Sequence, residues 1–223
     1  MKTTESAASR FARRFVACAP ASLIAAVLAC APNAHASPVK DSTLLAALQH
    51  GGCIILMRHA SSPDARPAAR TAAPGNINLE RQLDADGIAA ARAMGAALKR
   101  LSIRIGDVMS SPTFRARETI RAAGLGSPRI MDQLGDGGHS MSRSAIAGWS
   151  AWLRHAVGQQ PPAGSNRLIV TQGPNISDAY RRIASGLKAG GALIFRPDGH
   201  GNAQLLGSMQ IADWPQLAGQ FSH

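Results

Sequence analysis

The sequence predicts an α/β fold: a three-layer α/β/α sandwich around a mostly parallel sheet. Two short apolar runs, residues 53–57 and 167–171, have the length and β-branched content of strands buried on both faces. Longer segments between such runs carry apolar residues at three- and four-residue steps, as amphipathic helices do. Because strands and helices alternate along the chain, we expect a parallel sheet with helices on both faces.

The first 36 residues have the three-part plan of a secretory signal peptide. A basic front at residues 2–14 precedes a nearly uncharged run at residues 15–31, and residues 34–36 (Ala-His-Ala) form a small-x-small cleavage site. We expect cleavage after residue 36, a mature domain of residues 37–223 and a periplasmic or secreted location. The alternative is lipidation at Cys30. A membrane anchor is disfavoured because the apolar run is shorter than the roughly 20 residues that span a bilayer.

The charge balance favours an anionic small molecule as the partner. The leader holds four of the 24 Lys and Arg residues and one of the 13 acidic residues, which leaves a net charge of +8, nearly all from arginine. Arginine binds phosphate and carboxylate in a fork. The absence of basic runs interleaved with aromatic residues argues against nucleic acid. Cys53 is the only cysteine after the leader, so we expect a buried thiol and no internal disulfide.

Each element in the first half of the domain has a local signal. Asp41-Ser42 can cap a helix that Gly51-Gly52 ends, and the strand at residues 53–57 follows. Residues 60–81 are punctuated by proline and glycine without a sustained period, which predicts a long loop. Its Arg66, Arg70 and Arg81 are candidates for lining a pocket, with solvated charge as the alternative for the first two. Residues 84–101 form the clearest helix, with acidic residues at its start and basic ones at its end.

The second half repeats the pattern and closes with a hairpin. Pro112 ends the strand at residues 105–110 and suits the first turn of the next helix. The predicted elements are that helix (113–123), a short strand (129–131), a glycine-rich loop (132–139), a helix (142–157), a strand (167–171), a helix (176–185), and two antiparallel strands (191–196 and 202–207).

Chemically capable side chains follow three of the predicted strands. Arg58 and His59 follow the first strand, Ser111 and Arg115 the second, and Gln172 the one at residues 167–171. Ligands bind at the carboxyl edge of open parallel sheets, so these residues are expected to converge there. Two guanidiniums can bind the oxygens of a phosphoryl group while an imidazole between them attacks phosphorus.

The ordered motifs resemble those of the histidine phosphatase superfamily, the phosphoglycerate mutase-like proteins. Arg58-His59-Ala60 matches the Arg-His-Gly or Arg-His-Ala of that family, and the segment 111–119 matches its Ser-Pro-x-x-Arg-Ala-x-x-Thr. Residues 78–87 are similar to the segment before its first long helix, and residues 168–175 to its second-histidine strand. The resemblance covers essentially all of residues 37–223.

The resemblance implies a role for each residue of the pocket. His59 is implied as the nucleophile that forms a phosphohistidine, with Arg58 and Arg115 as the phosphate clamp. Gln172 stands where the family has a second histidine, and it too is expected to bind phosphate. The family needs no metal or organic cofactor, and the remaining histidines lack metal-ligand spacing. The implied partner is a phosphorylated small molecule or phosphate; the oligomeric state stays open.

Because Gln172 replaces the second histidine of the family, the sequence is compatible with two functions. Glutamine donates a neutral N–H but adds no charge, and a charge-assisted hydrogen bond is roughly twice as strong; loss of one well-placed donor typically lowers rates by about 10²–10³. The leading hypothesis is an exported phosphatase acting on a phosphomonoester through His59, with weakened activity. The alternative is a non-catalytic phosphate- or phospho-ligand-binding member of the same fold. A basic envelope-associated adaptor has only the net charge in its favour.

The proton donor to the leaving group is open among three carboxylates. Asp136, flanked by glycines, is the first candidate, followed by Asp132 and Glu80. His139, in the same glycine-rich loop as Asp136, is a hypothetical substitute for the missing histidine.

Overall fold

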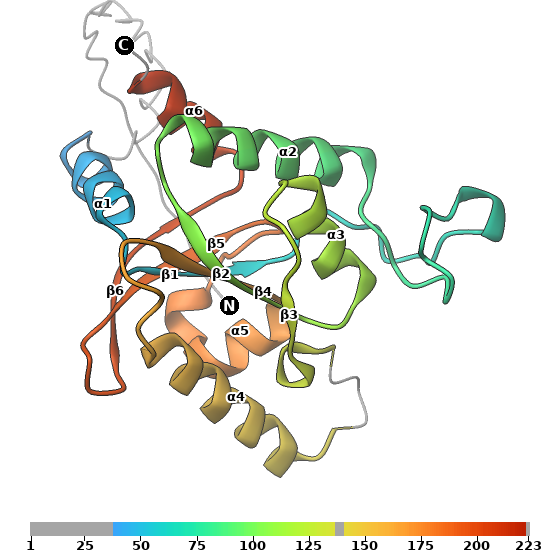
Figure 1. The fold of residues 1–223 in the computed structure, drawn as a ribbon. Helices are drawn as coiled ribbons and strands as arrows, with labels where there is room; N and C mark the ends of the chain where they lie inside the picture. The colour runs from blue at the N-terminus through green and yellow to red at the C-terminus, as the bar shows by residue number, and fades with distance from the viewer. Residues whose placement is uncertain (1–37, 137–140, 222–223) are drawn as a thin grey trace, which may run out of the picture. The chain divides into compact units, whose positions relative to one another are not determined.

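A six-stranded sheet with the order β3-β2-β4-β1-β5-β6 organises the fold (Figure 1). The structure is a computed structural model that describes residues 38–136 and 141–221, so the expected signal peptide and His139 lie outside the described residues. β1, β2, β3 and β4 are mutually parallel, whereas β5 and β6 are antiparallel to their neighbours. The strands are β1 (Ile54–Arg58), β2 (Ile105–Ser110), β3 (Arg129–Ile130), β4 (Asn166–Thr171), β5 (Ala192–Pro197) and β6 (Ala203–Met209).

Helices cover both faces of the sheet, which confirms the predicted sandwich (Figure 1). Side chains along β1 alternate between the faces: Ile55 and Met57 pack with α1, α2, α3 and α6, and Ile54 and Leu56 pack with α4 and α5. The helices are α1 (Pro38–His50), α2 (Ala85–Arg100), α3 (Phe114–Ala122), α4 (Arg143–Gly158), α5 (Gly173–Tyr180) and α6 (Asp213–Gln220), with short 3₁₀ turns η1 (Ala69–Thr71), η2 (Asp132–Leu134) and η3 (Arg181–Ala184).

Three helices differ from the sequence-based expectation. α1 begins at Pro38, so Asp41 and Ser42, the expected cap, lie inside the helix. α5 begins at Gly173, three residues before the predicted start, because Pro174 fits the first turn of a helix. The helix α6 was not predicted at all. It buries Trp214, Leu217 and Ala218 against the core, a spacing typical of one helical face, but it has only eight residues and contains a proline.

The three central parallel strands bring their carboxyl ends to one line. Arg58 at the end of β1 lies opposite Thr171 at the end of β4, and Ser110 at the end of β2 lies opposite Val170. Hydrogen bonds continue one residue further: the amide of His59 donates to the Thr171 carbonyl at 3.1 Å. The residues that follow these strands therefore start from the same edge of the sheet. Within the described ranges no helix is long and apolar enough to cross a membrane.

Candidate active site

His59 lies just beyond β1 and is 4 % exposed. Its Nδ1 is 2.7 Å from the carbonyl oxygen of Ala60, which can only accept, so Nδ1 carries the ring proton. Nε2 is therefore the unprotonated ring nitrogen, and its lone pair accepts a hydrogen bond from Nε of Arg115 at 3.1 Å. Burial, together with the charges of Arg115, Arg58 and Arg81, lowers the pKa of His59 to about 4, against the opposing effect of the Ala60 carbonyl. The imidazole is therefore neutral at pH 7.

Arg115 reaches the same point from α3 and is also 4 % exposed. Its helix is tied to the end of β1 through Thr119, whose hydroxyl accepts from the amide of Ala60 at 3.1 Å and donates to the carbonyl of Arg115 at 2.8 Å. This link places the start of α3 beside the residue after His59. A buried guanidinium on a fixed helix is a preorganised anion binder.

Arg58 supplies a second guanidinium with an open donor. Its Nε is buried and has no hydrogen-bond partner among the described residues. A Cβ on Gly173 would lie 3.4 Å from both Cδ and Nε of Arg58, so the start of α5 packs against this side chain. Since buried donors are nearly always paired in native proteins, an open one at the edge of the sheet is suited to a ligand.

Gln172, at the end of β4, is 2 % exposed and connects β4 to α3. Its Oε1 accepts from both Nε and Nη2 of Arg115, at 3.1 and 2.6 Å. Its Nε2 donates to the hydroxyls of Ser111 and Thr113, at 3.1 and 2.9 Å. The acceptor side of the amide thus faces the guanidinium, and the donor side faces away from it.

The three candidate proton donors lie in different surroundings. Asp136 forms an ion pair with Nη2 of Arg115 at 2.7 Å, and its side chain is 58 % exposed. The Glu80 carboxylate accepts from the amide of Phe114, the first residue of α3, at 2.7 Å. Asp132 begins η2 and is exposed. Of the three, Asp136 is the one in direct contact with the pocket.

A comparison with known protein families matches the part of the chain that contains these residues. The model of the histidine phosphatase superfamily (branch 1) matches residues 54–188, which include β1, α3 and the end of β4. The chain belongs to the histidine phosphatase superfamily. No curated protein sequence is significantly similar to it.

Solved histidine phosphatase structures resemble the fold. The protein histidine phosphatase SixA complexed with tungstate is 18 % identical, with a TM-score of 0.53, and the match covers 72 % of this chain and 98 % of that one. A putative phosphohistidine phosphatase SixA from Agrobacterium tumefaciens is 20 % identical (TM-score 0.47; 71 % and 97 % covered). A mutant phosphoserine phosphatase from Entamoeba histolytica with bound phosphoserine is 15 % identical (TM-score 0.49; 71 % and 97 % covered). At these identities the likeness to the tungstate complex shows the fold.

The structure singles out one of the three loop arginines. Arg81 donates from Nε to the Pro63 carbonyl at 2.9 Å and from Nη2 to the Ser62 carbonyl at 3.2 Å. These carbonyls follow His59 closely in sequence, and the charge of Arg81 is one cause of the low pKa of His59. Arg66 and Arg70 are exposed. The sequence named all three arginines, but only the hydrogen bonds separate Arg81 from the others.

The roles of Ser111 and Thr113 behind Gln172 were not predicted. Both residues lie in the Ser-Pro-x-x-Arg-Ala-x-x-Thr segment that also carries Arg115. Their place in that segment is the sequence feature from which a contact with the pocket residues could have been predicted.

In the described part of the chain no group of three His, Cys, Asp or Glu side chains could hold a metal ion.

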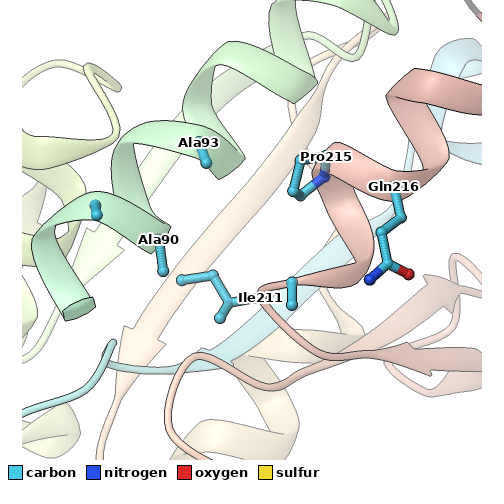
Figure 2. A pocket seen from close by; sticks show the side chains of 7 residues that line it. Ala90, Ala93, Ile211, Pro215 and Gln216 are labelled. Atoms are coloured by element: carbon cyan, nitrogen blue, oxygen red, sulfur yellow. The ribbon is translucent and has the colours of Figure 1, made fainter.

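A hollow of about 540 Å³ lies elsewhere, between α2 and α6 (Figure 2). Ala90 and Ala93 line it from α2, and Ile211, Pro215 and Gln216 line it from the other side. Its lining contains no ionisable side chain.

Proposed function

We propose that the protein is an exported phosphatase that hydrolyses a phosphomonoester through a phosphohistidine at His59. One observation carries the proposal: a buried, neutral imidazole presents its Nε2 lone pair to Arg115, which contacts it at 3.1 Å. The charge of Arg58, whose buried Nε has no described partner, also acts on this imidazole. A neutral nucleophile beside two permanent cations suits attack on a phosphate dianion.

The proposed reaction has two displacement steps. The His59 Nε2 lone pair attacks phosphorus, the bond from phosphorus to the leaving oxygen breaks, and that oxygen takes a proton. Water then attacks phosphorus and gives up a proton to the carboxylate that protonated the leaving oxygen, the phosphorus–nitrogen bond breaks, and phosphate leaves with the neutral imidazole restored. Arg58 and Arg115 bind the phosphoryl oxygens in both steps and stabilise the charge of each transition state.

Asp136 is the proposed proton donor, because its carboxyl group is the candidate that already lies against Arg115. In this role the carboxyl group enters the first step protonated and gives its proton to the leaving oxygen. When a phosphoryl group takes over Arg115, the Asp136 side chain is released beside the leaving oxygen.

The proposed location of this reaction is the periplasm or the extracellular medium. It rests on the signal-peptide pattern of residues 1–36, with residues 37–223 as the mature enzyme. Lipidation at Cys30 is the alternative form of export. Alkaline phosphatase fusions to residues 1–36, with and without a Cys30→Ala change, distinguish the two by the size and solubility of the exported product.

The test of the proposed activity is turnover of p-nitrophenyl phosphate by residues 37–223. We expect His59→Ala to reduce turnover to background, while His155→Ala, an exposed histidine on α4, leaves it unchanged. We also expect kcat/KM, after correction for ionisation of the substrate, to fall on the acid side only near the His59 pKa of about 4. Turnover that survives His59→Ala would contradict the proposal.

The second candidate function is binding of phosphate or a phosphorylated ligand without catalysis. It is favoured by the neutral amide of Gln172, which adds no positive charge at the pocket. Phosphate-dependent thermal stabilisation without turnover, lost on changing both Arg58 and Arg115 to Ala, would support it. Gln172→His then separates the two candidates: a gain in turnover means that the rest of the catalytic pocket is intact.

A further inference from the structure

The Gln172 amide has no hydrogen-bonding capacity left for a ligand. A carboxamide offers two N–H donors and two acceptor lone pairs. Here Oε1 accepts twice from Arg115, and Nε2 donates to Ser111 and Thr113. All four positions are therefore occupied by the protein itself.

The hydroxyls behind Gln172 fix which way its amide points. Ser111 Oγ donates to Thr113 Oγ1 and accepts from the backbone amide of Thr113, both at 3.2 Å, so its remaining lone pair faces the Gln172 N–H. With the amide reversed, its NH₂ group would meet the guanidinium of Arg115, donor against donor. The observed orientation is the one in which all of these donors find acceptors.

The consequence falls on Arg115. Its side chain has many rotamers, and a buried carbonyl that accepts from both Nε and Nη2 holds one edge of the guanidinium in place. We infer that Gln172 is a positioning residue: it acts on phosphate through Arg115, which it orients, and does not contact the phosphoryl group. The inference rests on the proposed phosphate site and assigns Ser111 and Thr113 as the support of that orientation.

A double-mutant cycle on phosphate binding tests this without requiring turnover. Four proteins are compared: wild type, Gln172→Leu, Arg115→Met and the double variant. The probe is inorganic phosphate, and the affinity is read by ³¹P line broadening, which reaches weak binding. Gln172→Leu should weaken phosphate binding roughly 10–100-fold in the presence of Arg115, the range for a lost hydrogen bond to a charged group, and have almost no effect in the Arg115→Met background.

An equal loss in both backgrounds would overturn the inference, because it would mean that Gln172 contacts phosphate itself. No phosphate binding by the wild type would instead overturn the proposed function, so the two failures are distinguishable. Near-UV circular dichroism of each variant confirms that its side chains remain packed.

Ser111→Ala gives a second and milder test, in case Gln172→Leu does not fold. It removes one acceptor of the Gln172 N–H without touching the guanidinium. We expect a severalfold loss of phosphate affinity with Arg115 present and none in the Arg115→Met background. In an active enzyme the same loss appears in kcat/KM. A phosphate affinity equal to that of the wild type would count against the support role of the hydroxyls.

Discussion

Two groups of arginines at the central sheet differ in how fully their donors are used. The Asp107 cluster (Asp107, Arg129 and Arg167) lies near the starts of β3 and β4, where the Arg167 guanidinium donates to Asp107 at 2.6 Å. The other nitrogens of Arg167 donate to the carbonyls of Ala156, Gln159 and Gln160, and Arg129 donates to both oxygens of Asp107.

The His59 cluster (His59, Arg58 and Arg115) at the opposite end of the strands is not saturated in this way. Arg58 has a buried Nε without a partner among the described residues. The anionic partner of Arg115 is Asp136, whose side chain is more than half exposed. Arginines that are fully paired hold elements together, whereas arginines with open donors are available to an external anion.

Acid weakens both clusters, for opposite reasons. Burial raises the pKa of Asp107, but hydrogen bonds from Arg129 and Arg167 outweigh this effect and hold the pKa below 3.8. The stability that the ionised carboxylate contributes is therefore lost as the pH falls through its folded pKa. His59 has a folded pKa of about 4, below the ordinary 6.5, so the unfolded chain gains protons first and stability declines between these two pH values.

The largest effect expected from this comparison is at Arg58. Arg58→Met should lower phosphate affinity roughly 10–100-fold, the range for a lost hydrogen bond to a charged group. It should also raise the free energy of unfolding by about 1 kcal/mol, because a buried donor without a described partner is removed. Calorimetric titration with phosphate and urea unfolding measure the two quantities. Arg92→Met, at an exposed position on α2, is the control. A variant that loses both affinity and stability would show that Arg58 is a structural arginine after all.

The opposite outcome is expected at Asp107. Asp107→Asn should destabilise the protein by about 1–3 kcal/mol, because two guanidiniums lose a charged acceptor, and leave phosphate affinity unchanged. Its loss of stability should be present at pH 7 and shrink as the pH falls through the lowered pKa of Asp107, because the wild-type carboxylate is then itself protonated. Urea unfolding at pH 7, 5 and 3 gives this profile. A change in phosphate affinity at pH 7 would break the division between the two clusters.

The sequence was sufficient to predict where a side chain lies when its position is set by the end of a strand. Arg58 and His59 directly follow a strand that is recognisable from its apolar run, and parallel strands end at a common edge, so the convergence of these side chains with Arg115 and Gln172 could be predicted. The α/β/α architecture followed from the alternation of elements in the same way.

The sequence was insufficient where side-chain contacts decide. The direction of the Gln172 amide depends on two hydroxyls about 60 residues away in sequence, and no local pattern encodes it. The contact between Arg81 and the Ser62 carbonyl depends on the path of a loop without periodicity. The helix α6 is short and contains Pro215, so tertiary packing of Trp214 rather than propensity accounts for it.

The smallest expected effect concerns Asp136, the carboxylate that pairs with Arg115 of the His59 cluster and is also the proposed proton donor. Its ion pair with Arg115 is partly exposed and therefore contributes at most about 1 kcal/mol. Asp136→Asn removes an anion that competes for the guanidinium, so it should strengthen phosphate binding no more than about fivefold.

If Asp136 is also the proton donor, the same variant should lower kcat for alkyl phosphates far more than for p-nitrophenyl phosphate. The leaving oxygen of an alkyl phosphate needs a proton, whereas p-nitrophenolate does not. Equal effects on both substrates would assign Asp136 to charge balance alone and return the proton donor to Glu80 or Asp132. Tighter phosphate binding with unchanged kcat values would show that Asp136 competes with phosphate for the Arg115 guanidinium. The paired arginines of the Asp107 cluster show no such competition with an external anion.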